Sequence, residues 1–85
     1  MKRDIALEIK VCNIIIEYCK GKCEECFIEM EQQEMRLERE ISEAEREDCF
    51  ARRFFAKYDY RFWDGRRTEE YLKRKNLELQ LKTST

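Results

Sequence analysis

The stretch IALEIKVCNIIIEYCKGKCEECFIEM, residues 5–30, is the part of the sequence that decides the expected fold. Apolar residues recur along it at alternating spacings of four and three, the pattern of a heptad seam in a coiled coil. These seam positions are Ile5, Ile9, Cys12, Ile16, Cys19, Cys23, Cys26 and Met30. The spacing predicts a helix that buries one narrow stripe against another helix.

The composition points the same way. The 85 residues fit one domain, and a domain of this size buries a limited share of its surface, which favours oligomerisation. Charged residues make up 44% and hydrophobic residues 42%, which is too apolar for a disordered chain and too charged for a membrane span. With no proline and two glycines, the chain lacks the turn residues of a many-stranded β fold. We therefore predict an all-α protein.

The two glycines mark the expected helix boundaries. Gly21 lies between two lysines, which suits a helix C-terminus, and Asp64-Gly65 is a turn signal followed by Thr68 as a candidate N-cap. We expect a helical hairpin or small helical bundle with a long acidic central helix and a short C-terminal helix. The expected elements of this single domain are an N-terminal helix over 1–20, a central helix over 23–62 and a C-terminal helical segment over 68–82.

Three alternatives remain open at this level. One helix could run through Gly21, because a helix-interior glycine costs only ~1 kcal/mol relative to alanine. Residues 4–12 and 77–82 alternate at period two, as short strands would. A β-hairpin at Asp64-Gly65 would also fit the aromatic alternation before it.

Charge is segregated along the chain although the net charge is −1. Residues 24–48 contain eleven carboxylates and three arginines, which gives −8, whereas residues 49–75 contain nine cations and four carboxylates, which gives +5. An array of carboxylates can compete for a basic surface on another protein. The candidate acidic surface comprises Glu31, Glu34, Glu38 and Glu45.

Residues 52–75 interleave cations with aromatic rings, the mixture with which single-stranded nucleic acids are bound through phosphates and stacked bases. The candidate residues for a partner or a nucleic acid are Arg52, Arg53, Lys57, Tyr58, Tyr60, Arg61, Trp63, Arg66, Arg67, Lys73 and Arg74. We expect Phe50, Phe54, Phe55 and Phe62 to lie in the core. The acidic block could instead face these cations within the chain or across a homodimer.

The five cysteines allow three interpretations. Cys19-x3-Cys23-x2-Cys26 resembles the iron–sulfur motif of radical S-adenosylmethionine enzymes over eight residues, but the large barrel that carries that motif does not fit in 85 residues. A thiolate zinc site would draw on Cys19, Cys23, Cys26 and Cys49, with no histidine to help. The favoured interpretation is core thiols and no cofactor, because Cys12, Cys19, Cys23 and Cys26 occupy seam positions. A disulfide is the third possibility.

No catalytic site is expected. The chain has no histidine and no glycine-rich phosphate loop, and Ser42 has no neighbouring base that suits a nucleophile. The start of the sequence does not read as a secretory signal, and no apolar run approaches the ~18 residues of a membrane span. We expect a cytoplasmic, homodimeric regulator or inhibitor that binds another protein, with a nucleic-acid-binding regulator and a zinc-stapled domain as alternatives.

Overall fold

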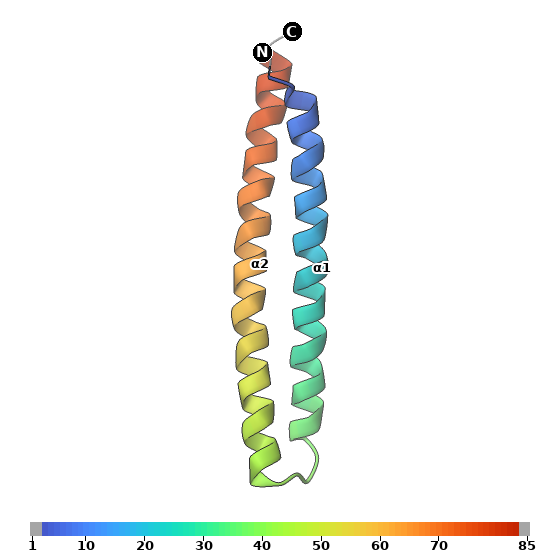
Figure 1. Ribbon diagram of the computed structural model, residues 1–85, viewed down its shortest axis with the longest axis vertical. Helices are drawn as coiled ribbons and strands as arrows, with labels where there is room; N and C mark the ends of the chain where they lie inside the picture. The colour runs from blue at the N-terminus through green and yellow to red at the C-terminus, as the bar shows by residue number, and fades with distance from the viewer. Residues whose placement is uncertain (1–2, 84–85) are drawn as a thin grey trace.

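The computed structural model describes residues 3–83, and within them the chain folds into two long helices and no strands. Helix α1 spans Ile5–Leu37 and helix α2 spans Glu43–Thr83. They run antiparallel side by side and are joined by residues 38–42 at one end (Figure 1). A helix of 41 residues is about 61 Å long at ~1.5 Å per residue, which accounts for the molecule's dimensions of 64 × 16 × 16 Å. The all-α prediction is confirmed.

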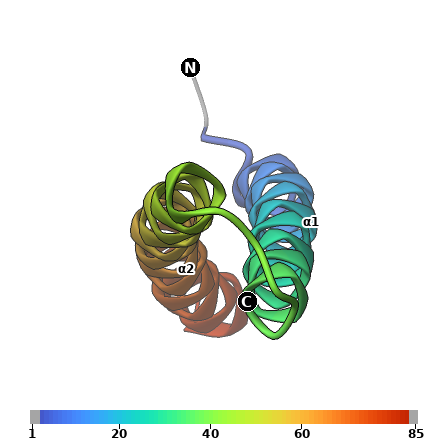
Figure 2. The ribbon, with the colours of Figure 1, turned by 90° about the horizontal axis from the view of Figure 1, so that it is seen from below.

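Both helices begin at a side chain that accepts a backbone hydrogen bond. The Asp4 carboxylate accepts one from the backbone N–H of Leu7 at 3.0 Å, and the Ser42 hydroxyl oxygen accepts one from the N–H of Glu45 at 3.2 Å. These bonds satisfy N–H groups that have no partner inside the helix. Seen along the long axis, the two helices are inclined to each other and the connection crosses between them (Figure 2).

The predicted helix boundaries are wrong. The chain does not turn at residues 20–22, the long acidic helix over 23–62 does not exist, and no break separates it from a segment over 68–82. Gly21 and Gly65 both have ordinary helical backbone without positive φ, so neither ends a helix. Thr68 is not an N-cap, because its hydroxyl donates to the carbonyl of Asp64 one turn earlier.

The actual connection, residues 38–42, falls inside the central helix predicted over 23–62. Ser42-x-x-Glu45 has the sequence of a capping box, and its Ser42 hydrogen bond is the one that starts α2. The strand alternatives are wrong as well, because residues 5–12 lie in α1 and residues 77–82 lie in α2. The alternating residues of α1 divide between faces, with Ile9 half-buried and Leu7 exposed.

The core is one seam between the helices. Each predicted seam residue of α1, from Ile5 to Met30, is buried or half-buried. On α2 the buried positions recur every seven residues, the repeat that lets two helices wrap around each other along one seam. These are Cys49, Ala56, half-buried Trp63, Glu70 and Leu77.

The four phenylalanines expected in the core lie outside it. Phe50, Phe54, Phe55 and Phe62 are 52–66% exposed. Two helices have only one contact line between them, and the seven-residue repeat of α2 places other residues on that line, so these phenylalanines lie to the side of it. None of the described helices combines the length and apolarity needed to cross a membrane.

Candidate interaction surfaces

The cysteines lie in the seam and do not converge. Cys19, Cys23 and Cys49 are buried and Cys26 is half-buried, and all are free thiols. Cys49 is next to Asp48, which contacts Arg36, ten residues beyond Cys26 in α1. Ten helical residues span about 15 Å, far beyond the reach of a shared metal ion. Within residues 3–83, no three Cys, His, Asp or Glu side chains are grouped as metal ligands.

The seam environment favours the protonated form of three of the thiols. Burial raises the pKa of the Cys12, Cys23 and Cys26 thiols. At Cys12 the neighbouring Glu70 carboxylate raises the pKa further. A thiol with a raised pKa is a weak nucleophile and a poor metal ligand at neutral pH, because both roles require the thiolate. The arrangement therefore suits packing.

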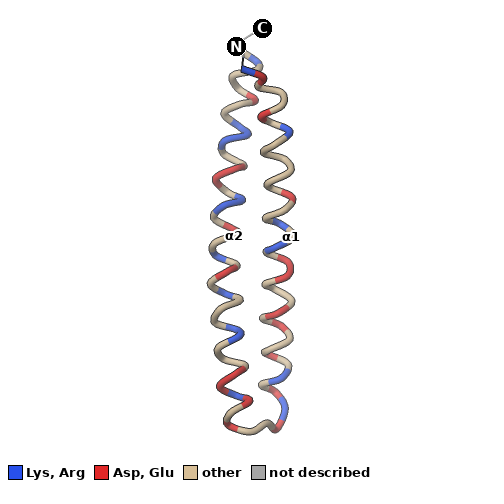
Figure 3. The backbone as a smooth tube through the Cα atoms, viewed as in Figure 1, with Lys and Arg blue, Asp and Glu red and all other residues tan. Residues whose placement is uncertain are grey.

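The carboxylates nominated for binding gather at the connected end of the molecule. We call residues 31–48 the acidic tip: eight carboxylates and three arginines give it a net charge of −5 (Figure 3). Glu31, Glu34, Glu38 and Glu45 are all exposed there. Of the eight carboxylates, the ion pairs among the described residues use only Glu34, which meets Arg53 at 3.2 Å, and Asp48.

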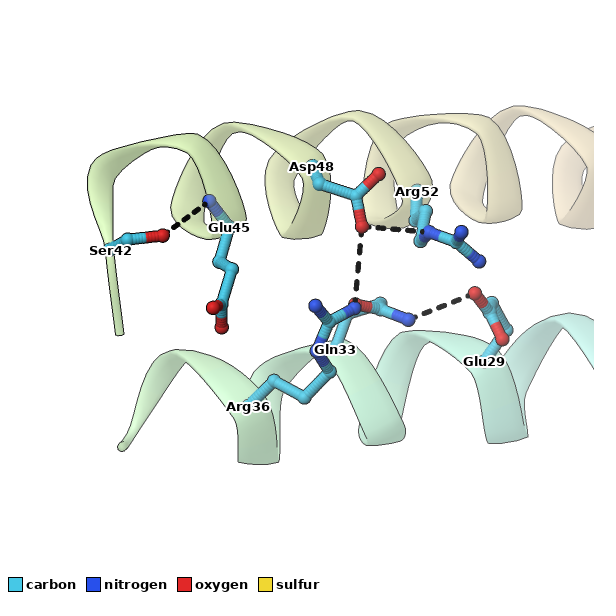
Figure 4. A network of polar contacts seen from close by, with 7 residues as sticks. All are labelled: Glu29, Gln33, Arg36, Ser42, Glu45, Asp48 and Arg52. Carbon is cyan, nitrogen blue, oxygen red and sulfur yellow. Dashed lines mark hydrogen bonds and ion pairs between the residues drawn. The ribbon is translucent and has the colours of Figure 1, made fainter. Parts of the chain in front are cut away.

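A polar network fixes the base of the acidic tip (Figure 4). Gln33, only 4% exposed, donates to Glu29 at 3.0 Å and accepts from Arg36 at 2.9 Å. The Asp48 carboxylate then joins the helices, contacting Arg36 at 3.4 Å and Arg52 at 2.9 Å. Gln33 is a polar residue at a buried seam position, but both its amide nitrogen and its amide oxygen form hydrogen bonds. The network holds the two helix ends together where the carboxylates are presented.

The nominated cations are largely paired within the chain. Arg52 contacts Asp48, Arg53 contacts Glu34, and the remaining pairs lie one turn apart within α2. Those pairs are Arg66 with Glu69 and Glu70, Arg67 with Asp64, and Arg74 with Glu78. Ion pairs in residues 3–83 do not involve Lys57, Arg61 or Lys73. The positive field of residues 52–75 is therefore much weaker than its composition implies.

The nominated aromatic rings are also partly occupied. Trp63 meets Tyr18 of α1 edge-on at a centroid distance of 5.6 Å and Phe62 at 5.0 Å. Tyr60 packs against Phe27 at 6.2 Å. Only Tyr58, 67% exposed, presents its ring freely to solvent. Two of the three rings proposed for base stacking thus help to join the helices.

One groove does bring cations together across the helices. Lys20 of α1 and Arg67, Tyr71 and Arg74 of α2 line it, and its volume is about 440 Å³. Arg74 is held there by a 2.8 Å hydrogen bond to Asn13. The sequence did not single out Lys20 or Tyr71 for this site. Lys20 lies in α1, outside the cationic residues 49–75, and only the antiparallel packing of the helices places it beside Arg67.

The acidic tip and the cationic groove are separated in the structure. The tip lies at the connected end of the molecule, and the groove lies in the other half. Comparison with known proteins finds no matching family model, no matching curated sequence and no matching solved structure.

Proposed function

We propose that this protein is a small interaction module that regulates or inhibits another protein, which it binds through the acidic tip. The observation that carries the proposal is the set of unpaired carboxylates: six of the eight in residues 31–48 form no ion pair with the described part of the chain. Carboxylates that do not stabilise their own fold remain available to a partner. The proposed role is binding without catalysis.

The chemistry of the tip defines the class of partner. A net charge of −5 at one end of a narrow molecule attracts a basic surface and accelerates its association. Nucleic-acid-binding proteins carry such surfaces, so competition with nucleic acid for one of them is the most concrete form of the proposal. The network around Gln33 would hold the two helix ends that carry these carboxylates, so that on binding only their side chains have to be ordered.

The test is an affinity capture from the native host with two charge-matched variants. Glu38→Gln with Glu45→Gln removes two charges from the acidic tip, and Glu17→Gln with Glu69→Gln removes two from the other half of the molecule. We expect the tip variant to lose the captured partner, and the control to retain it. Equal capture by both variants, or no specific partner with the unmodified protein, would overturn the proposal.

A second candidate is nucleic-acid binding, and the groove of Lys20, Arg67 and Arg74 favours it. Lys20, Arg67 and Arg74 line a groove of about 440 Å³ together with Tyr71, which could stack on a base, and the carboxylate Glu17. A phosphate bound there would compete with Glu17 and with the carboxylates that pair with Arg67 and Arg74. Labelled single- and double-stranded oligonucleotides at two salt concentrations test this function. Binding that weakens steeply with salt and with Lys20→Gln would support it, whereas no binding at low salt would remove it.

A further inference from the structure

Each helix carries a second row of apolar residues on the side away from the seam. On α1 the row recurs every seven residues, and we call it the α1 stripe: Leu7, Ile14, Gly21, Ile28 and Met35. The α2 stripe has the same spacing and comprises Ala51, Tyr58, Gly65, Leu72 and Leu79. The large side chains of both stripes are 54–69% exposed, so the described part of the chain leaves them uncovered.

The two stripes face opposite sides of the molecule. Each stripe residue lies two positions from a seam residue, as Ile14 does from Cys12 and Ile16, and two positions turn a helix by about 200°. The stripes therefore point away from the seam. Because the seam sides of α1 and α2 face each other, one stripe looks outward from each side of the helix pair. A second copy that covers one stripe leaves the other exposed.

The surroundings of the two stripes are opposite in charge. Residues three or four positions from a stripe residue are its neighbours on the helix surface. Between Leu7 and Met35 the charged neighbours are one lysine and four glutamates, which gives −3: Lys10, Glu17, Glu24, Glu25 and Glu31. Between Ala51 and Leu79 they are two cations and one carboxylate, which gives +1: Arg61, Glu69 and Lys75. Two α1 stripes would repel each other, whereas an α1 stripe attracts an α2 stripe.

Several of these charges are available for such a contact. The ion pairs among residues 3–83 do not involve Glu17, Glu24 or Glu31 on the α1 side, nor Arg61 on the α2 side. The fold of the single chain therefore does not use them. Opposite charges around two apolar stripes fix which faces pair.

Both stripes have a glycine near mid-length. Gly21 is the central residue of α1, and Gly65 is two residues from the centre of α2. A methyl group added at either position would meet nothing within 4 Å, and neither glycine has a positive φ. Glycine is unfavourable inside a helix, and nothing within the described chain explains either residue. A neighbouring helix that approaches closely at mid-length would explain both.

The two glycines also lie at a similar height. Asn13 of α1 contacts Arg74 of α2, and Phe27 of α1 contacts Tyr60 of α2. Gly21 lies between the first two of these α1 and α2 levels, and Gly65 lies between the same levels on the other helix. Copies placed side by side at the same level therefore bring Gly21 of one copy near Gly65 of the next, whichever way the neighbour points.

The exposed area is large enough for two contacts per chain. A compact monomer of 10.5 kDa exposes about 5,400 Å² by the usual scaling with mass, whereas this chain exposes 7005 Å². The surplus is about 1,600 Å². Shared between two stripes, it gives about 800 Å² for each, which is the area that a standard interface takes from one partner.

From these observations we infer that the chain assembles head to tail, with the α1 stripe of each copy packed against the α2 stripe of the next. Every internal copy then has both stripes covered, and unlike charges meet at each contact. A contact between two different faces does not close after two copies, so it builds a ring or a filament. The inference does not depend on the partner proposed for the acidic tip, and each can fail without the other.

Analytical ultracentrifugation over a concentration series tests the assembly. The unmodified protein should sediment as species larger than a dimer. Ile14→Glu in the α1 stripe and Leu72→Glu in the α2 stripe should each give a helical monomer, because both side chains are exposed in the single chain. The controls Ala6→Glu and Phe50→Glu add the same charge at exposed positions outside the stripes and should still assemble. A monomeric unmodified protein would overturn the inference.

Mixing the two stripe variants distinguishes a head-to-tail contact from a symmetric one. Each variant keeps one intact stripe, the α2 stripe in Ile14→Glu and the α1 stripe in Leu72→Glu. An equimolar mixture should therefore form a one-to-one pair and nothing larger, although each variant alone is monomeric. A variant that dimerises alone would show that like stripes pair, and would refute the contact. So would a mixture that stays monomeric under conditions in which the unmodified protein assembles.

The one-to-one pair also tests close approach at the glycines. Gly21→Ala, added to the Leu72→Glu variant, favours the helix itself, so a loss of affinity must come from the contact. We expect the dissociation constant of the pair to rise at least tenfold, with unchanged helix content by circular dichroism. An unchanged dissociation constant would refute close approach at Gly21.

Discussion

Replacing Glu70 by methionine should make the protein more stable, although it removes an ion pair. Glu70 occupies a seam position and is only 4% exposed. One of its carboxylate oxygens meets Arg66 at 3.2 Å, and the other, Oε2, is buried without a hydrogen-bond partner. A charged group in the apolar seam is thus only half satisfied.

The magnitude follows from two opposing contributions. Removing a buried polar atom that lacks a partner is worth about 1–3 kcal/mol. The lost ion pair costs at most about 1 kcal/mol, since half-exposed Arg66 is screened by solvent and keeps Glu69 as a neighbour. Methionine fills a similar volume and adapts to irregular gaps. The balance is a gain of about 1–2 kcal/mol in the free energy of unfolding.

Urea unfolding followed by circular dichroism, at one fixed protein concentration, measures this change. A gain of this size also raises the melting temperature by about 4–8 °C per kcal/mol for a domain of this length. Glu69→Met is the matched control, because Glu69 also contacts Arg66 but is exposed, and its effect should stay within about 0.5 kcal/mol. A loss of more than about 1 kcal/mol with Glu70→Met would refute the reasoning, and would mean that the buried carboxylate stabilises the fold.

The remaining predictions concern caps, core, pH and metal. Ser42→Ala should lower the free energy of unfolding by about 1 kcal/mol, because it removes the cap of α2. Leu77→Ala should lower it by about 2–5 kcal/mol, since Leu77 is the largest fully buried side chain. Stability should fall as the pH rises past ~8.5, where the unfolded chain loses thiol protons before the folded chain does; replacing Cys12, Cys23 and Cys26 by alanine should flatten that fall in pH-dependent melting. Elemental analysis should find no stoichiometric zinc, and a chelator should leave the melting temperature unchanged.

The sequence predicted the packing of α1 well and the ends of the helices poorly. The four-and-three spacing from Ile5 to Met30 reports a side-chain environment, and that environment is the seam of the structure. Gly21 misled because glycine is compatible with both a turn and a helix, and its cost of about 1 kcal/mol is too small to end a helix with a continuous apolar seam. The signal that mattered was Ser42-x-x-Glu45.

The sequence predicted where charge is concentrated, but not which charged side chains remain unpaired in the fold. Net charge by segment located the acidic tip, because consecutive residues of a helix stay near one another. Which charges remain free depends on the register between the helices, and the sequence does not state that register. Arg53 pairs with Glu34 and Trp63 contacts Tyr18 only because the antiparallel packing of the helices brings these residues together across the seam. The exposed phenylalanines were misplaced because aromatic residues in small domains usually lie inside.

The distribution of apolar side chains connects the fold to its surfaces. The seam buries four cysteines, Ala56, Gln33 and Glu70, and Leu77 is its only large aliphatic side chain that is fully buried. All five phenylalanines, together with Leu7, Ile14, Ile28, Leu72 and Leu79, instead lie more than half exposed on the outside. Because burial stabilises in proportion to apolar area, the helix pair by itself gains less from its core than it would gain by covering its exterior. If this exterior is covered by a second copy or by another protein, the melting temperature should rise with the concentration of that partner.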